Sequence, residues 1–528
     1  MATSAPGPAS AFSMREILAE QVERLEASGS NLNIPQLIEE SDLNVLSFDE
    51  KIAALQMQIA ALVELRDREL ATRAALQHLA SPIRTLPVEI LSEIFLLTLR
   101  SLPESESDFS HIPAAHRVSQ VCSEWRFVAL HTPQLWAGPL TFRLNKVSSA
   151  QNELYAAGLR VWLARSAARS IPIIFRFFWD DDDSWNSLNR RTLEEVVHVA
   201  SRWRSLHFYG SGHRALSILR GLEPDSLLCL EELVLWTAEQ DEARIDPTNI
   251  QCFSTAPKLR KLAINVSCRV PMPWAQLTAL TLSDINTLDA LADVFNQCPG
   301  LVHVHISLPG ERLPAGRVNL IVLNHLRTLV LNFREAGALA MGFVAHLCAP
   351  VLDDLRLYFD ILPEQNWDEQ SFTTFQSRSP SITKLDLEIA DSSLHISSHA
   401  FRNVFLHAPL LSHLQISMER FCDVALLEGL THAESDAQPL LPRLCSLTFS
   451  DIQFGVVGDA LADMIRSRWW TDEELASRPS PPAVARWSEV NLTGDYRNER
   501  EEISQSFRDS MDALRSSGLQ VRVKDSET

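Results

Sequence analysis

Glycine is scarce in this sequence, and so are the loop motifs that depend on it. Only 17 of the 528 residues are glycine, which leaves few places for loops that cradle phosphate groups. The chain has no G-x-x-x-x-G-K-[ST] loop, no H-E-x-x-H, no G-x-S-x-G and no cysteine–histidine spacing typical of zinc sites. We therefore expect no catalytic residues, no cofactor and no metal ion in this chain.

Long hydrophobic runs and paired cysteines are also lacking. No apolar stretch reaches the about 18 residues that a membrane span requires, and the first residues show no basic region followed by an apolar run, so we expect neither a membrane span nor a secretory signal. The eight cysteines form no C-x-x-C pair, and most have apolar neighbours. They are typical of reduced, buried thiols, which favours a cytoplasmic or nuclear protein.

Positive charge is in deficit. The chain has 47 Lys plus Arg against 67 Asp plus Glu, a formal net charge of −20. Binding to nucleic acid requires clustered cations that neutralise phosphates, and binding to anionic membranes requires them as well. We expect neither partner.

Helical patterns occupy the N-terminal part of the chain. Residues 1–45 are predicted to be a partly disordered tail with one helix around Ile17–Leu25, and residues 46–80 an amphipathic helix. Its apolar residues Ile52, Leu55, Ile59 and Leu62 form one seam, which then meets Arg66, Glu69 and Arg73. The seam favours either packing of this helix on its own chain or self-association through a short coiled coil.

Residues 81–145 contain two further amphipathic patterns. Between Leu86 and Leu99 the only polar residues are Glu89, Ser92, Glu93 and Thr98, so the polar stripe is narrow and two faces of the helix are apolar. A small helical domain can bury one such face, and the other is then available to a partner. A second helix is predicted from the helical spacing of four residues, Val118, Cys122, Trp125 and Ala129, and is expected to end at Thr132-Pro133.

The rest of the chain repeats. A core of the form L-x-x-L-x-L, with apolar substitutions, recurs at intervals of 18 to 33 residues. Proline stands two residues before six of the cores, where it can end a preceding helix. The ten cores start at Trp203, Leu230, Leu259, Leu277, Leu301, Leu326, Leu352, Ile382, Leu411 and Leu444.

These features are typical of leucine-rich repeats, in which each unit contributes one strand and one helix. We therefore predict an α/β protein, in which helices and a small all-α module precede a leucine-rich-repeat solenoid with parallel strands inside and helices outside. The irregular solenoid is expected over residues 146–485. Residues 486–528, which contain the predicted strand GLQVRV, are expected to cap it.

The helical module over residues 81–145 resembles an F-box. The resemblance lies in L-P-V-E-I-L from Leu86 to Leu91, then Ile94-Phe95, Val121-Cys122 and Trp125-Arg126. The combination with irregular leucine-rich repeats is similar to the F-box proteins of mushroom-forming fungi. That resemblance implies binding to the Skp-type adaptor of a cullin ubiquitin ligase, and a role for the repeats in binding the target protein.

Carried over by position, the resemblance implies a set of residues that contact the adaptor or support the contact. They are Leu86, Pro87, Ile90, Leu91, Ile94, Phe95, Val118, Val121, Cys122 and Trp125. The alternative for this pair of helices is a cap on the N-terminal end of the solenoid.

The intervening positions of the cores predict a target-binding surface. In a strand they face away from the buried leucines, so stacked repeats bring them onto one concave surface. We expect Trp236 and the Arg356–Tyr358 pair to act as anchors, although polar residues occur there in any solenoid. The candidate residues are Trp236, His303, His305, Arg356, Tyr358, Lys384, Asp386, Glu388, His413 and Gln415.

Two patterns could suggest metal binding. The run Asp180–Asp183 lacks the alternating oxygen ligands of a calcium loop and is predicted to be a solvated loop. His303 and His305 would point the same way from a strand, but no third ligand is apparent at a fixed spacing. Exposed strand positions are the preferred interpretation.

The leading hypothesis is a recognition subunit of a cullin-type ubiquitin ligase, in which partner enzymes perform the chemistry. The alternative is a repeat scaffold that binds other proteins and recruits no ligase. An enzymatic function has no supporting motif in the sequence.

Overall fold

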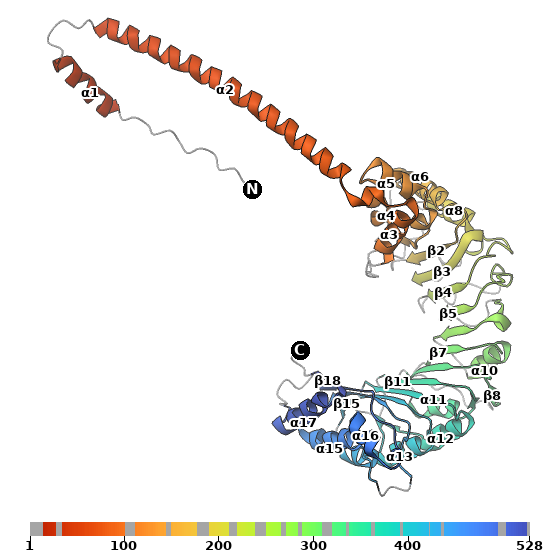
Figure 1. Ribbon diagram of the computed structural model, residues 1–528. Helices are drawn as coiled ribbons and strands as arrows, with labels where there is room; N and C mark the ends of the chain where they lie inside the picture. The colour runs from red at the N-terminus through yellow and green to blue at the C-terminus, as the bar shows by residue number, and fades with distance from the viewer. Residues whose placement is uncertain are drawn as a thin grey trace. The chain divides into compact units, whose positions relative to one another are not determined.

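The computed structural model (Figure 1) describes most of the chain, and the statements below concern only these residues. The described ranges are 14–27, 34–100, 111–143, 149–176, 190–210, 219–237, 250–265, 271–283, 288–308, 319–333, 337–360, 365–390, 394–421, 423–434, 438–494 and 503–524. The chain divides into two units, residues 1–91 and 92–528, and each is described by itself. The division falls inside helix α3 (Val88–Arg100).

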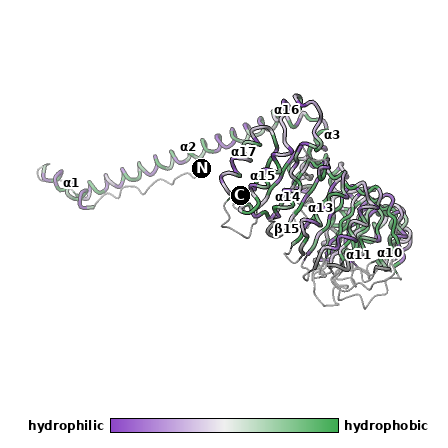
Figure 2. The backbone as a smooth tube through the Cα atoms, turned by 90° about the horizontal axis from the view of Figure 1, so that it is seen from below, coloured by the Kyte–Doolittle hydropathy of each residue, from purple (hydrophilic) through white to green (hydrophobic). Residues whose placement is uncertain are grey.

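Two helices dominate residues 1–91. Helix α1 (Met14–Ala27) includes the stretch expected to be helical around Ile17–Leu25. Helix α2 spans Ile34–Leu79 and therefore begins twelve residues before the expected start at residue 46. Pro35 lies in its first turn, where a missing N–H costs nothing, and no glycine or proline follows up to Leu79. Apolar residues recur along the whole of α2 (Figure 2).

The second helical pattern of the F-box-like region is two helices and not one. Helix α4 spans His111–Ser119 and helix α5 spans Ser123–Leu130. Cys122 has an extended backbone between them, and its Sγ accepts a hydrogen bond from the backbone N–H of Trp125 (3.4 Å). Arg126 Nε donates to the Ser119 carbonyl at the end of α4 (3.0 Å). Cys122 thus caps α5 and is not a residue inside a longer helix.

Fourteen parallel strands form one sheet, in chain order except that β8, β10, β12 and β14 stand apart as two small pairs. Neighbouring strands are parallel throughout the main sheet. The strands of the sheet are β1 (Leu140–Arg143), β2 (Ile171–Arg176), β3 (Trp203–Gly210), β4 (Glu232–Thr237), β5 (Lys261–Ile264), β6 (Ala279–Leu282), β7 (His303–Leu308), β9 (Thr328–Phe333), β11 (Asp354–Phe359), β13 (Lys384–Ile389), β15 (His413–Phe421), β16 (Ser446–Ile452), β17 (Glu489–Gly494) and β18 (Gln520–Lys524). The pairs are β8 (Ile321–Val322) with β10 (Leu347–Cys348), and β12 (Gln365–Asn366) with β14 (Leu394–His395).

Helices connect many of these strands, and Figure 1 shows α10 to α13 on one side of the sheet. None of the helices among the described residues is both long enough and apolar enough to cross a membrane. The remaining helices are α6 (Ser149–Arg165), α8 (Arg190–His198), α10 (Leu288–Gln297), α11 (Gly337–Val344), α12 (Glu369–Arg378), α13 (Ser398–Leu406), α14 (Val424–Leu430), α15 (Phe454–Ser467), α16 (Asp472–Ser477) and α17 (Gln505–Ser516). Short 3₁₀ turns lie at Pro82–Thr85, Pro133–Trp136, Ala200–Arg202 and Trp274–Gln276.

Two ladders of apolar side chains run across all fourteen strands. On the ten strands that carry a core, the rung of one ladder is the fourth residue of the core, as in Leu355, which is paired with Leu329 on one side and Leu385 on the other. In the other each rung is the sixth residue, as in Leu357, between Leu331 and Leu387. The rungs named here are at most 6% exposed. The predicted leucine-rich-repeat solenoid of parallel strands and connecting helices is confirmed.

Local signals set the helix boundaries between strands. Helices α12, α13 and α14 begin after Asp368, Ser397 and Asp423, whose side chains each accept a hydrogen bond from a backbone N–H of the first turn. The ends of α10, α12 and α13 are each followed by a proline within three residues. Helix α12 ends at Arg378 and is followed by Pro380.

The sheet extends beyond the ten predicted cores at both ends. Strands β1 and β2 precede the first core, and β1 belongs to the sheet although it lies inside the expected helical module of residues 81–145. Residues 486–528 contain β17, α17 and β18, so this segment adds two strands to the sheet, with β18 at its edge.

Arg468 is the largest buried charge near the C-terminal end and is only 1% exposed. Its guanidinium donates to three backbone carbonyls, those of Leu430 (3.1 Å), Leu441 (3.0 Å) and Leu440 (2.7 Å). It also lies 5.7 Å from the ring centroid of Trp487. Burial lowers the pKa of Arg468 to about 10. The side chain supplies hydrogen-bond donors to carbonyls that are buried between α14 and β16.

We expect the Arg468→Met variant to lower the free energy of unfolding by about 2–4 kcal/mol, because it removes the Arg468 hydrogen bonds to the buried carbonyls of Leu430, Leu440 and Leu441. The measurement is urea unfolding followed by tryptophan fluorescence. The matched control is Arg443→Met, since Arg443 is exposed on the neighbouring segment. Equal unfolding midpoints for the two variants would show that the three hydrogen bonds contribute little.

Candidate functional site

The strand face is the surface of the sheet formed by the side chains that alternate with the two apolar ladders. Strand geometry places successive side chains on opposite faces, and all ten predicted target-binding residues lie on the strand face. Trp236, His305, Tyr358 and Asp386 are half-buried, and the other six are exposed. The sequence therefore identified the face correctly, while which of its residues bind a partner stays a prediction.

A charged cluster lies on β11 and β13, formed by Asp354, Arg356, Tyr358, Asp386 and Glu388. Register pairs Arg356 with Asp386 and Tyr358 with Glu388. The Arg356 guanidinium donates two hydrogen bonds to the Asp354 carboxylate, at 3.1 and 2.8 Å. These bonds raise the pKa of Arg356 above its usual value, so the guanidinium is held in one orientation on the face.

Some hydrogen-bond acceptors in and beside this cluster receive no hydrogen bond from the described residues. The Tyr358 hydroxyl donates to Asp386 Oδ2 over 3.4 Å. Asp386 Oδ1 and, on the neighbouring strand β9, Asn332 Oδ1 are buried and have no hydrogen-bond partner among the described residues. Burial, followed by the charge of Glu388, raises the pKa of Asp386, while Arg356 opposes the rise. Buried acceptors without donors favour binding of a group that brings N–H or O–H donors.

An aromatic cluster lies nearer the N-terminal end of the face, formed by Arg176, His207, Tyr209, Glu232 and Trp236. Register aligns Arg176, Tyr209 and Trp236 on β2, β3 and β4. The Arg176 guanidinium lies 5.5 Å from the Tyr209 ring centroid, and the His207 and Tyr209 rings meet edge to face at 6.2 Å. His207 Nε2 is 3.6 Å from Glu232 Oε1, and burial lowers the pKa of His207 while Glu232 opposes this.

Only Trp236 of this aromatic cluster was predicted. Tyr209 lies one residue beyond the six-residue core WRSLHF, and Arg176 belongs to a strand without a recognised core. His207 occupies an intervening position of the core WRSLHF, and Tyr209 is the next position of the same alternation. Applying the alternation to this core and one step beyond it would have predicted His207 and Tyr209. Trp236 is also not adjacent to Arg356 and Tyr358, because β4 and β11 are five strands apart, about 24 Å along the sheet. The expected anchors therefore belong to two separate clusters.

The two patterns considered for metal binding have different outcomes. His303 is exposed and His305 half-buried on β7. Among the described residues no group of three or more histidine, cysteine, aspartate or glutamate side chains is arranged to hold a metal ion. The run Asp180–Asp183 lies outside the described residues.

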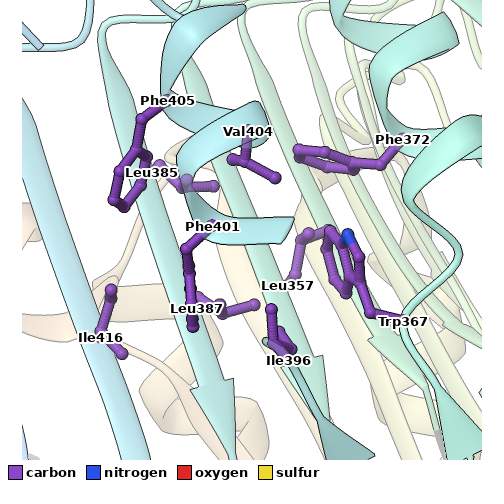
Figure 3. Close-up of a pocket in the computed structure, with 10 residues that line it drawn as sticks. All are labelled: Leu357, Trp367, Phe372, Leu385, Leu387, Ile396, Phe401, Val404, Phe405 and Ile416. Carbon is purple, nitrogen blue, oxygen red and sulfur yellow. The ribbon is translucent and has the colours of Figure 1, made fainter. Parts of the chain in front are cut away.

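The interior beneath the charged cluster is closely packed. Figure 3 shows side chains from β11, β13 and β15 meeting those from α12 and α13 around an apolar cavity of about 10 Å³. Trp367, Phe372 and Phe401 are among the aromatic residues that line it. Ligand pockets commonly measure about 300–1,000 Å³, so this cavity is a packing gap. The strand face, and not the interior, is the candidate binding surface.

The expected adaptor-binding residues occur in both units. In residues 1–91, Pro87 and Ile90 are exposed, Leu86 is half-buried and Leu91 is buried. Of the expected adaptor-binding residues in residues 92–528, Val121 is exposed, at 60%. Phe95 is buried. The other four are half-buried, and they are Ile94, Val118, Cys122 and Trp125.

Buried residues of this set support the fold of the helices, whereas exposed ones are available to a partner. The ring of Phe95 lies 4.8 Å from that of Trp125, so this pair supports the fold of the helices. The apolar side chains that stay exposed on α3, α4 and α5 include three that were not predicted, Val88, Leu97 and Phe127, at 50%, 56% and 58%.

Comparison with known proteins adds little to these observations. No model of a protein family matches the chain, and no curated protein matches it. Among solved structures, the leucine-rich repeat-containing protein LegL7 from Legionella pneumophila is similar over 51% of this chain and 90% of its own, with 15% sequence identity and a TM-score of 0.29.

We expect Asp386→Asn to raise the melting temperature at neutral pH by about 1–2 °C. Because the pKa of Asp386 is raised in the folded state, the unfolded chain holds fewer protons between the two pKa values, and stability falls as pH rises through that range. The asparagine removes this loss. The gain should disappear below about pH 3.9, the ordinary pKa of aspartate. Asp293→Asn, at an exposed aspartate on α10, is the control, and an equal gain there would contradict the assignment to Asp386.

Proposed function

We propose that this chain is the target-recognition subunit of a cullin-type ubiquitin ligase. Its F-box-like helices bind a Skp-type adaptor and its strand face binds the target protein. The chain itself performs no catalysis, and partner enzymes transfer ubiquitin. The observation that carries the proposal is that apolar side chains stay exposed on helices whose sequence resembles an F-box.

Helix α3 has a buried side and an exposed apolar side. Leu91 and Phe95 are 2% and 1% exposed, whereas Ile90 and Leu97 are 49% and 56% exposed. A solvated helix surface normally carries polar residues at such positions. Apolar side chains that stay exposed near the start of a repeat array are suited to contact another protein. Val121 and Phe127 add further exposed apolar surface in residues 92–528.

The strand face is suited to protein recognition. Its aromatic cluster supplies Tyr209 and Trp236, and its charged cluster supplies Arg356 and Tyr358, which are residue types enriched at the centres of protein interfaces. Both clusters sit on strands held by buried ladders, so a target binds to side chains whose positions are already fixed. Held beside the ubiquitin carrier in this way, the target reacts through proximity.

The first prediction concerns the adaptor. In the full-length chain, Ile90→Ala combined with Val121→Ala should weaken binding to a Skp-type adaptor by at least about 10-fold, because truncating interface anchors commonly costs 2 kcal/mol or more. Isothermal titration calorimetry with the purified adaptor measures the effect. Leu154→Ala with Val456→Ala is the matched control, since these apolar residues are 71% and 58% exposed on α6 and α15.

Failure of the unmodified chain to bind the adaptor at about 10 μM would contradict the ligase role. A chain that still captures partner proteins through the strand face would then be a repeat scaffold without ligase recruitment. If the Ile90/Val121 variant and the Leu154/Val456 control bind the adaptor equally weakly, the exposed apolar residues of the F-box-like helices are not the adaptor contact.

The second prediction concerns the target. Once a co-purifying protein is identified, Trp236→Ala and Tyr358→Ala should each weaken its binding, because each removes an aromatic side chain from one of the two clusters. Adaptor affinity and melting temperature serve as controls. Loss with one variant alone would confine the contact to one cluster, and unchanged affinity in both would move the target site off the strand face.

A further inference from the structure

Helix α2 presents an extended apolar surface that its own unit does not cover. The helix has 46 residues, and of its side chains that the structure describes only Ser47 is not exposed. Phe48, Leu55 and Leu62 are 61%, 57% and 65% exposed. An isolated helix with this much apolar surface requires a partner helix or surface.

Seven of the exposed apolar residues of α2 fall on a seven-residue repeat that spans four heptads. The first core position of each heptad, conventionally called a, is Ile38, Val45, Ile52 and Ile59. The fourth, called d, is Ser41, Phe48, Leu55 and Leu62. Only the last two heptads were recognised from the sequence, because the helix was expected to begin at residue 46. Since α2 is continuous from Ile34, all four heptads lie on one face, which meets the three to four heptads that indicate a coiled coil.

The residue types along this seam indicate which kind of helix can pair with it. Every a position is β-branched and the last two d positions are leucine, the combination that favours a parallel two-stranded coiled coil. In such a pair each g residue meets the e residue of the next heptad on the other helix. Within residues 38–65 the resulting pairs are Asn44 with Asp49, Lys51 with Gln56 and Gln58 with Val63. None of these pairs joins like charges.

Charged residues determine where the apolar seam ends. The next a and d positions are Arg66, Glu69 and Arg73, and two copies in register would bring Arg66 against Arg66. Buried like charges repel each other, so pairing ends near Leu65. The last fourteen residues of α2 then separate the paired segment from the F-box-like helices.

The other apolar helix of this unit is too short to replace a second copy. Helix α1 has 14 residues and a length of about 21 Å, while the seam from Ile38 to Leu62 is about 36 Å long. Exposed residues Ile17, Leu18 and Val22 of α1 could cover about half of the seam.

We propose that α2 pairs with α2 of a second copy of this chain, over residues 38–65, as a parallel coiled coil in register. The dimer carries two strand faces, so a target with two recognition segments binds with an avidity that a single copy lacks. The proposal is independent of ligase recruitment.

Size-exclusion chromatography with light scattering tests the pairing. The full-length chain at about 10 μM should have twice its mass of 59.2 kDa. Ile52→Glu with Ile59→Glu places charges in the seam and should weaken dimerisation by at least about 100-fold. The matched control is Ala53→Glu with Ala60→Glu, which adds the same charges one residue along, away from the seam. Ile52→Ala with Ile59→Ala tests the apolar contact without added charge, and circular dichroism monitors helix content.

Cysteine cross-linking tests the orientation. Val45→Cys should form an intermolecular disulfide with itself in a parallel, in-register dimer, beyond any formed by the unmodified chain. In an antiparallel dimer Val45→Cys would instead cross-link to Leu55→Cys. A monomer at this concentration, a dimer that survives both seam variants, or the antiparallel cross-link would each overturn the proposal. A monomeric chain would point to α1 or another part of the same chain as the cover of α2.

Discussion

The fold depends on in-register stacking of apolar side chains across parallel strands. Each strand places two side chains into the interior, and hydrogen bonds between strands align them with the equivalent pair on the next strand. A single repeat would leave Leu355 and Leu357 half in water, but between neighbours both are fully buried. Stability therefore comes from interfaces between repeats, and a shift of one residue would turn every ladder residue outward.

This constraint also explains how the candidate binding surface arises. Because the ladders fix every second side chain inside, the remaining side chains of fourteen strands share one face. Residues that are far apart in sequence become neighbours, as Arg176, Tyr209 and Trp236 do. The same rigidity leaves Asp386 Oδ1 and Asn332 Oδ1 without donors among the described residues, since strand positions cannot turn away to solvent. A recognition surface of this kind is assembled by the fold at little entropic cost on binding.

The helices before the sheet solve a different problem. Helices α2 and α3 both carry apolar residues that stay exposed. Ile52 and Ile90 are 51% and 49% exposed, values that the ladder residues never approach. Such surfaces are economical for a chain whose proposed role is to join other proteins, because binding supplies the missing burial. The proposed dimer and the proposed adaptor contact use different helices, so the two are separable.

The sequence by itself determined the repeat class, the ladder positions and the alternation that defines the strand face, because these depend on local period and on residue type. It determined the position of the ten cores, yet β1, β2 and β17 lacked a core that the pattern recognised. Tertiary structure alone decided which strand-face residues meet. It set Trp236 five strands from Tyr358 and gave Arg468 its three buried carbonyls. The break at Cys122 depends on its cap and on Arg126 reaching back to Ser119. Helical spacing alone does not reveal contacts of this kind, because they join residues through space and not through the period of the chain.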